Sequence, residues 1–115
     1  FLRNAGTIPL DRRGDVHAMR AALELLERGG CLGVFPEGTR SKDGRPGQPK
    51  AGVGFLAARS GAAVVPARLR GMRDFPLRRG LRVRFGEPLW LKDKHANRAA
   101  CLAFSEEVMR RVFSL

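Results

Sequence analysis

The sequence lacks tyrosine and holds only one tryptophan, two cysteines and two histidines in its 115 residues. So few aromatic residues argue against the aromatic-rich sheets that bind single-stranded RNA. Cys31 and Cys101 lie far apart in the sequence and show no metal-ligand spacing, so we expect no metal site. Both cysteines are predicted to be buried, reduced structural thiols, as in a protein that faces the cytosol.

Long apolar runs and acidic residues are also scarce. No run approaches the roughly 20 residues that cross a membrane, so any membrane contact of these residues is expected to be peripheral. Eleven acidic residues stand against 22 basic ones, which gives a net charge of +11, and arginine supplies 18 of the basic residues. This balance favours an anionic partner such as a phosphate ligand, an acidic lipid or a nucleic acid. A coding bias toward arginine, alanine and glycine would produce the same charge.

Length and the opening residues set the domain organisation. A chain of 115 residues forms one domain at most, with one modest core. The stretch that begins at Phe1 reads as the middle of a helix or strand. We therefore expect residues 1–115 to be a single partial domain whose N-terminal part is missing.

Three helices are predicted, the first and the last of them from apolar residues that recur at helical spacing. The first follows a cap at Asp15 and ends at Gly29–Gly30, the second covers 52–59, and the third is C-terminal. The predicted buried faces of the first and third helices are Val16, Met19, Leu23 and Leu26, and Cys101, Phe104, Val108 and Val112.

Strands are predicted at 7–10, 31–35, 62–69 and 81–85. The continuous apolar runs at 31–35 and 62–69 are typical of strands buried on both faces, the second with Pro66 near its end. Residues 81–85 alternate, which indicates an edge strand with Leu81, Val83 and Phe85 inward. The order of the elements predicts an α/β fold with a mostly parallel or mixed sheet flanked by helices.

A polar block, "PEGTRS", directly follows the predicted strand at 31–35. Ligands of open α/β sheets bind beyond the carboxyl ends of the strands, and Arg40 can form a charge-assisted contact with a phosphate there. Arg12 and Arg13 follow another predicted strand, and Lys50 follows a Gly/Pro-rich loop. Their convergence would make a phosphate site. Alternatively, the block is a polar surface turn in which Glu37 and Arg40 form an ion pair.

Five blocks, "GTIPLDR" (6–12), "FPEGTRS" (35–41), "PKAG" (49–52), "VVPARL" (64–69) and "VRFGEPL" (83–89), resemble in order and spacing those of the glycerolipid acyltransferases. The resemblance implies phospholipid biosynthesis, with transfer of a fatty acyl group from acyl-CoA or acyl carrier protein to 1-acyl-glycerol-3-phosphate, giving phosphatidic acid. It implies no cofactor beyond this acyl donor. The residues that it assigns to substrate binding are Gly6, Arg12, Glu37, Gly38, Thr39, Arg40, Lys50 and Pro66, with Pro66 on the acyl-donor side.

The sequence departs from the family in one respect. The family's general base belongs to a His-x-x-x-x-Asp block upstream of "GTIPLDR", and this block is absent here. Neither His17 nor His95 has an aspartate five residues later, and both are expected to be solvated. We therefore assign no catalytic residue, and do not expect these residues alone to catalyse acyl transfer.

Two other functions compete with this interpretation. One is a non-catalytic relative that only binds anionic lipids, and the other is a nucleic-acid-binding domain, which only the net charge favours. In the acyltransferase interpretation, Arg78, Arg79, Arg82 and Arg84 would rest on an acidic membrane, at its cytoplasmic side. Alternatively, these arginines form an ordinary solvated face.

Overall fold

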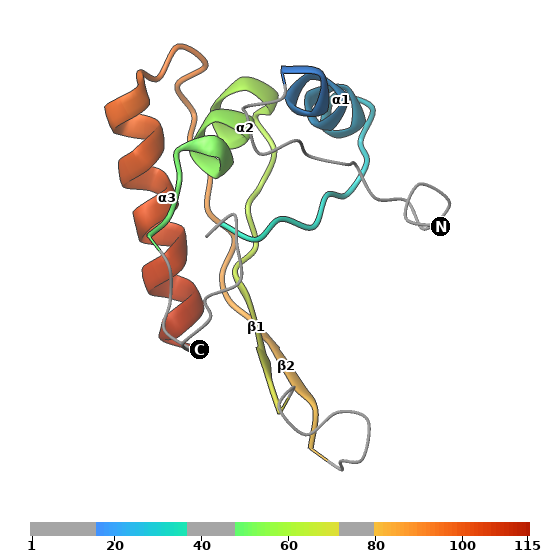
Figure 1. Ribbon diagram of the computed structural model, residues 1–115, viewed down its shortest axis with the longest axis vertical. Helices are drawn as coiled ribbons and strands as arrows, with labels where there is room; N and C mark the ends of the chain where they lie inside the picture. Colours follow the sequence, from blue (N-terminus) through green and yellow to red (C-terminus); the bar gives the residue numbers. More distant parts are fainter. Residues whose placement is uncertain (1–15, 37–47, 72–79) are drawn as a thin grey trace. The chain divides into compact units, whose positions relative to one another are not determined.

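The computed structural model describes residues 16–36, 48–71 and 80–115 (Figure 1). The chain divides into two compact units, Phe1–Val34 and Phe35–Leu115. In chain order the elements are α1 (Val16–Glu27), α2 (Gly52–Ser60), β1 (Ala67–Arg70), β2 (Arg82–Phe85) and α3 (Arg98–Phe113). The strand predicted at 7–10 lies outside the described residues, and the single domain stays a prediction.

Helix α1 of the first unit confirms the first predicted helix and its glycine stop. Gly29 has a φ of 81°, and the Gly30 N–H donates to the Leu25 carbonyl at 2.9 Å, so the helix ends in a left-handed glycine cap. The buried residues are Ala18 and Ala22. Of the predicted buried face, Met19, Leu23 and Leu26 are only half-buried and Val16 is 69% exposed.

The apolar run at 31–35 is not the buried strand that the sequence predicts. It has no strand assignment, Cys31 is exposed, and Phe35 is 80% exposed. A strand needs a neighbour that accepts and donates its backbone hydrogen bonds, and no described segment pairs with this run. Both the strand and the buried position of Cys31 were therefore wrong.

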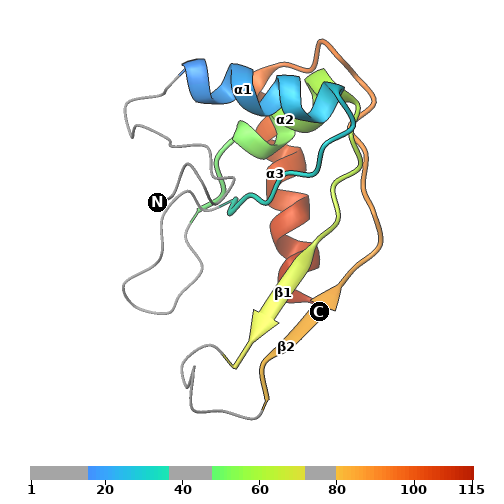
Figure 2. The ribbon, with the colours of Figure 1, turned by 90° about the vertical axis from the view of Figure 1, so that its right-hand side faces the viewer.

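Helices α2 and α3 of the second unit confirm the other two predicted helices and pack against each other (Figures 1 and 2). The contact is close because Gly54 has no side chain, and a Cβ there would overlap the Cys101 carbonyl. Cys101, as predicted, is buried, in a cluster with Ala58 and Ala96. Asn97 begins α3 by accepting the Ala100 N–H at 2.8 Å through its side chain.

Strands β1 and β2 form an antiparallel pair in which Ala67 lies opposite Phe85 and Arg70 opposite Arg82. Their connection, residues 71–81, is shorter than the dozen or more residues of a parallel crossover. The sheet formed by β1 and β2 is thus antiparallel. The mostly parallel or mixed sheet predicted from the sequence stays a prediction, and the described residues give it no support. Overall, the α/β mixture of helices and strands agrees with the predicted class.

The two described strands differ from their predictions in length and burial. The strand predicted at 62–69 is regular only from Ala67, directly after Pro66, which has no N–H to donate. It is not buried on both faces as predicted, since Val65 and Leu69 are each 50% exposed. The edge strand at 81–85 is confirmed as β2, but its side chains were expected to alternate between inside and outside. All of its residues are exposed, because nothing in the described part of the chain covers either face.

Candidate functional site

Only two of the predicted substrate-binding residues lie within the described residues. Lys50 is exposed just before α2, and Pro66 is fully buried just before β1. The others lie outside the described residues and stay predictions: Gly6, Arg12, Glu37, Gly38, Thr39 and Arg40.

A backbone hydrogen bond joins the two ends of the segment that carries the "EGTR" block. The Lys50 N–H donates to the Pro36 carbonyl at 3.1 Å. Pro36 directly precedes Glu37 in the sequence, so the bond places Lys50 beside the start of the block. The structure thus places the backbone of Lys50 next to Pro36, the residue that precedes Glu37 in the sequence.

Lys50 also lies two residues before α2, whose N-terminal end carries partial positive charge. Ala51 occupies the cap position and provides no side-chain hydrogen bond. The positive end of a helix together with a lysine favours an anion. This electrostatic environment is of the kind that a phosphate requires.

Helix α3 fixes the position of this end of α2 through a buried serine. The Gly54 N–H donates to the Ser105 Oγ at 3.1 Å, and this hydroxyl donates to the Cys101 carbonyl at 3.0 Å. Ser105 is completely buried. It takes the place of a local N-cap, because it satisfies an N–H of the first turn of α2 from a different helix.

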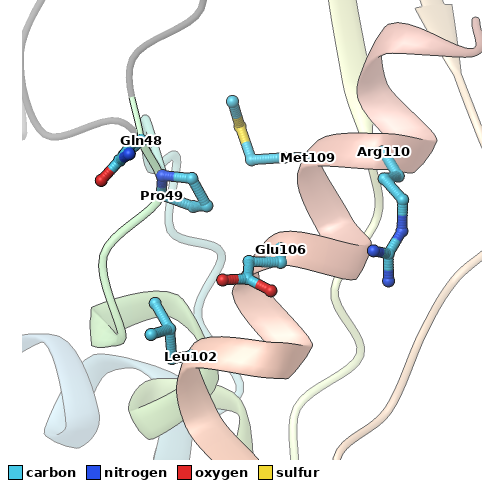
Figure 3. Close-up of a pocket in the computed structure, with 6 residues that line it drawn as sticks. All are labelled: Gln48, Pro49, Leu102, Glu106, Met109 and Arg110. Carbon is cyan, nitrogen blue, oxygen red and sulfur yellow. The ribbon is translucent and has the colours of Figure 1, made fainter. Parts of the chain in front are cut away.

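A pocket of about 420 Å³ lies between Gln48–Pro49 and α3 (Figure 3). Leu102, Glu106 and Met109 project from one face of α3 toward this segment. Pro49 on one side and Leu102 and Met109 on the other make part of its lining apolar.

Glu107 holds two arginines of α3, and one of them, Arg110, lines this pocket. Its carboxylate accepts from the Arg111 Nε at 2.8 Å and from the Arg110 Nε at 2.8 Å. The hydrogen bonds from Arg111 and Arg110 lower the pKa of Glu107 below its ordinary value of 4.5. The carboxylate is thus charged at neutral pH and orients Arg110, which lines the pocket.

Pro66 sits at a β-bulge. Its carbonyl accepts the Gly86 N–H at 2.8 Å, and Val64 pairs with Leu89 through two hydrogen bonds of 2.8 Å. Two residues, 87 and 88, thus lie opposite Val65 alone, and such a bulge bends the strand. The proline of the predicted fourth block and the "GEP" sequence therefore meet at one structural feature.

The described residues offer no further catalytic or metal-binding group. Within these ranges no cluster of three or more His, Cys, Asp and Glu side chains could hold a metal ion. His17 and His95 are both exposed, as predicted. No helix in the described part of the chain is long and apolar enough to cross a membrane.

Sequence reasoning missed Ser105 and the pocket. The Ser105–Gly54 bond joins residues 51 positions apart, and the pocket likewise combines two distant segments. The only local signal was a serine on the apolar face of a predicted helix, where its hydroxyl would need a partner.

Comparison with known proteins gives one family and several relatives. The model of the family described as Acyltransferase matches residues 1–70. A chloroplastic 1-acyl-sn-glycerol-3-phosphate acyltransferase of Arabidopsis thaliana is 48% identical over 69 residues, covering 57% of this chain and 19% of its own length. A chloroplastic protein of the same name from Brassica napus is 45% identical, covering 57% of this chain and 20% of its own.

A third relative, a 1-acyl-sn-glycerol-3-phosphate acyltransferase of Chlamydomonas reinhardtii, is 39% identical over 62 residues, covering 54% of this chain and 19% of its own length. The chain therefore spans about a fifth of the length of these relatives. No solved structure matches it significantly.

Proposed function

Because the chain belongs to the Acyltransferase family, we propose that it is part of an enzyme of phospholipid biosynthesis. The enzyme transfers a fatty acyl group to the free hydroxyl of 1-acyl-glycerol-3-phosphate and forms phosphatidic acid. The relatives named for this acceptor align with more than half of the chain, which supports the choice of substrate.

These residues supply the site for the acceptor phosphate. The observation that carries this assignment is the "FPEGTRS" block at 35–41, in which Arg40 is suited to a bidentate contact with phosphate. The Lys50–Pro36 hydrogen bond supports it, because Lys50 and the N-terminal end of α2 add positive charge where the block begins. Gly6, Arg12, Glu37, Gly38 and Thr39 complete the proposed site.

The acyl donor is acyl-CoA or acyl carrier protein, and Pro66 shapes the donor side of the site. Its burial at the bulge supports a structural role rather than direct contact with the donor. The enzyme acts as a peripheral protein at the cytoplasmic side of a membrane, where its lipid acceptor resides. The high net positive charge supports an acidic lipid surface as its location.

The alternative is a non-catalytic relative that binds anionic lipids. Such a protein would bind the acceptor phosphate and transfer no acyl group. Both functions use the same phosphate site, so acyl transfer itself distinguishes them.

The test compares two arginines of one segment in the full-length protein. Arg40→Ala removes the proposed phosphate contact, whereas Arg45→Ala removes an equal charge outside the block. A charge-assisted hydrogen bond corresponds to a loss of about 10- to 100-fold in kcat/KM for 1-acyl-glycerol-3-phosphate. We expect this loss for Arg40→Ala and not for Arg45→Ala. With a monoacylglycerol acceptor, which lacks the phosphate, Arg40→Ala should lower kcat/KM much less. Equal losses for the two variants, or for the two acceptors, would contradict the assignment.

A further inference from the structure

The register of β1 and β2 places four arginines on one face of the two-stranded ribbon. Arg68 lies directly opposite Arg84, and Arg70 directly opposite Arg82. Side chains alternate along a strand, so these four share a face. Like charges directly opposite each other disfavour the pairing of strands. A ribbon of this kind is favoured when anions neutralise the arginines.

The arginines of β1 already have partners. Arg68 donates to the carbonyls of Phe113 at 2.9 Å and Leu115 at 3.2 Å, and Arg70 donates to Leu115 at 2.9 Å. They satisfy carbonyls at the C-terminal end of α3, which lies beside the ribbon in Figure 2. The guanidinium groups of Arg82 and Arg84 on β2 form no hydrogen bond or ion pair with any residue in the described ranges. The guanidinium groups that are available to a ligand are therefore those of β2.

In the described part of the chain, the opposite face of the ribbon is apolar and exposed. Leu69 is 50% exposed and its partner Val83 is 48% exposed, while Phe85 is 70% exposed. The ribbon also extends past the C-terminal end of α3, away from the α2–α3 contact (Figures 1 and 2). Exposed apolar side chains that gather on one surface commonly mark a binding site.

We propose that the β1–β2 ribbon is the surface by which this protein docks onto an anionic lipid bilayer. Leu69, Val83 and Phe85 enter the layer between headgroups and acyl chains. Arg82 and Arg84 extend past the open edge of β2, as long basic side chains do, and pair with lipid phosphates. This inference rests on the membrane location in the proposed function and assigns a surface to it.

The combination of charge and apolar area selects this partner over two others. A second copy of the chain would place its own Arg82 and Arg84 next to those of the first copy at the β2 edge, and the like charges would repel each other. An acidic protein could neutralise the arginines without covering the apolar face. A phospholipid surface offers phosphates and hydrocarbon together, only a short distance apart.

The test is sedimentation of the full-length protein with vesicles, without acyl donor. One vesicle preparation is phosphatidylcholine alone, and the other includes phosphatidylglycerol as an anionic lipid. The double variant Arg82→Gln/Arg84→Gln should lower partitioning onto anionic vesicles about 30-fold, since each arginine near such a surface contributes about fivefold. Lys92→Gln/Lys94→Gln removes the same charge from two exposed positions outside the ribbon and should change partitioning far less.

Phe85→Ser tests the apolar face, and should weaken partitioning onto anionic vesicles without any change in charge. Circular dichroism checks that each variant is folded. Equal losses for the arginine and lysine pairs would overturn the proposal, as would unchanged binding of Phe85→Ser. Ribbon-dependent binding to an acidic carrier protein, with no vesicle binding, would also overturn it. A protein that docks in the expected pattern but transfers no acyl group would contradict the proposed function alone.

Discussion

Two parts of the same unit differ in the burial of their apolar residues. Helices α2 and α3 bury these residues between them, whereas the β1–β2 ribbon leaves them exposed. The helices direct small and apolar residues at each other and satisfy a buried N–H with Ser105. The ribbon leaves its apolar residues in contact with solvent and aligns arginines with arginines. The helix pair is therefore built for stability, whereas the ribbon retains groups that another molecule can satisfy.

The largest effect is expected at the closest point of the helix pair. Gly54→Ala places a Cβ against the Cys101 carbonyl, so the helices must separate. We expect the free energy of unfolding to fall by about 3 kcal/mol, measured by urea denaturation. Gly33→Ala is the control, because nothing lies within 4 Å of its Cβ, and should change stability by less than about 0.5 kcal/mol. Similar values for the two variants would mean that the helices do not meet at Gly54.

Ser105→Ala leaves the buried Gly54 N–H without an acceptor. The expected loss is about 2 kcal/mol in the free energy of unfolding. Ser114, whose hydroxyl donates to the Arg111 carbonyl at an exposed position, provides the matched control. A loss for Ser105→Ala no larger than that for Ser114→Ala would show that α3 does not cap α2.

A smaller contrast separates the two directly opposed arginines of the ribbon. Arg68→Gln removes hydrogen bonds to the end of α3 and should cost about 1 kcal/mol. Arg84→Gln removes a like charge with no described partner, so stability should stay the same or rise slightly. Thermal denaturation of the two variants in parallel measures this difference in stability. Equal destabilisation would remove the distinction between an anchoring β1 and an outward-facing β2.

The smallest expected effect is the pH dependence of the Glu107 ion pairs. The native pKa of Glu107 is lowered from 4.5, so its contribution is present above pH 4.5 and is lost as the pH falls through the native value. Glu107→Gln should therefore lower the unfolding midpoint slightly at pH 7, and the difference should vanish in strong acid. Glu106→Gln, next to it but outside these ion pairs, is the control. A difference that grows on acidification would contradict this sign.

The features that the sequence predicts correctly are those that depend on neighbours along the chain. The helical spacing of apolar residues located α1 and α3, and Gly29 marked the end of α1. The strand prediction at 31–35 was wrong because a strand depends on a partner segment, and no local sequence pattern indicates whether that partner is present. The prediction that alternate side chains of β2 point inward was wrong for the same reason, since no described element covers them.

The candidate site follows a similar division. Motifs predict substrate-binding residues by type and spacing, and these assignments stay predictions; of them the structure describes only Lys50 and Pro66. The cap from Ser105 and the pocket beside Pro49 arise from the packing of α3 against distant segments, which the sequence does not specify locally.

The most direct measurement of the central claim is product formation by the full-length protein. It would be incubated with 1-acyl-glycerol-3-phosphate and either acyl-CoA or acyl carrier protein loaded with a fatty acid, and phosphatidic acid would be quantified by mass spectrometry. We predict that phosphatidic acid forms with at least one donor and that Arg40→Ala strongly reduces its formation. Binding of 1-acyl-glycerol-3-phosphate without phosphatidic acid from either donor would contradict the enzyme and indicate a non-catalytic lipid-binding protein.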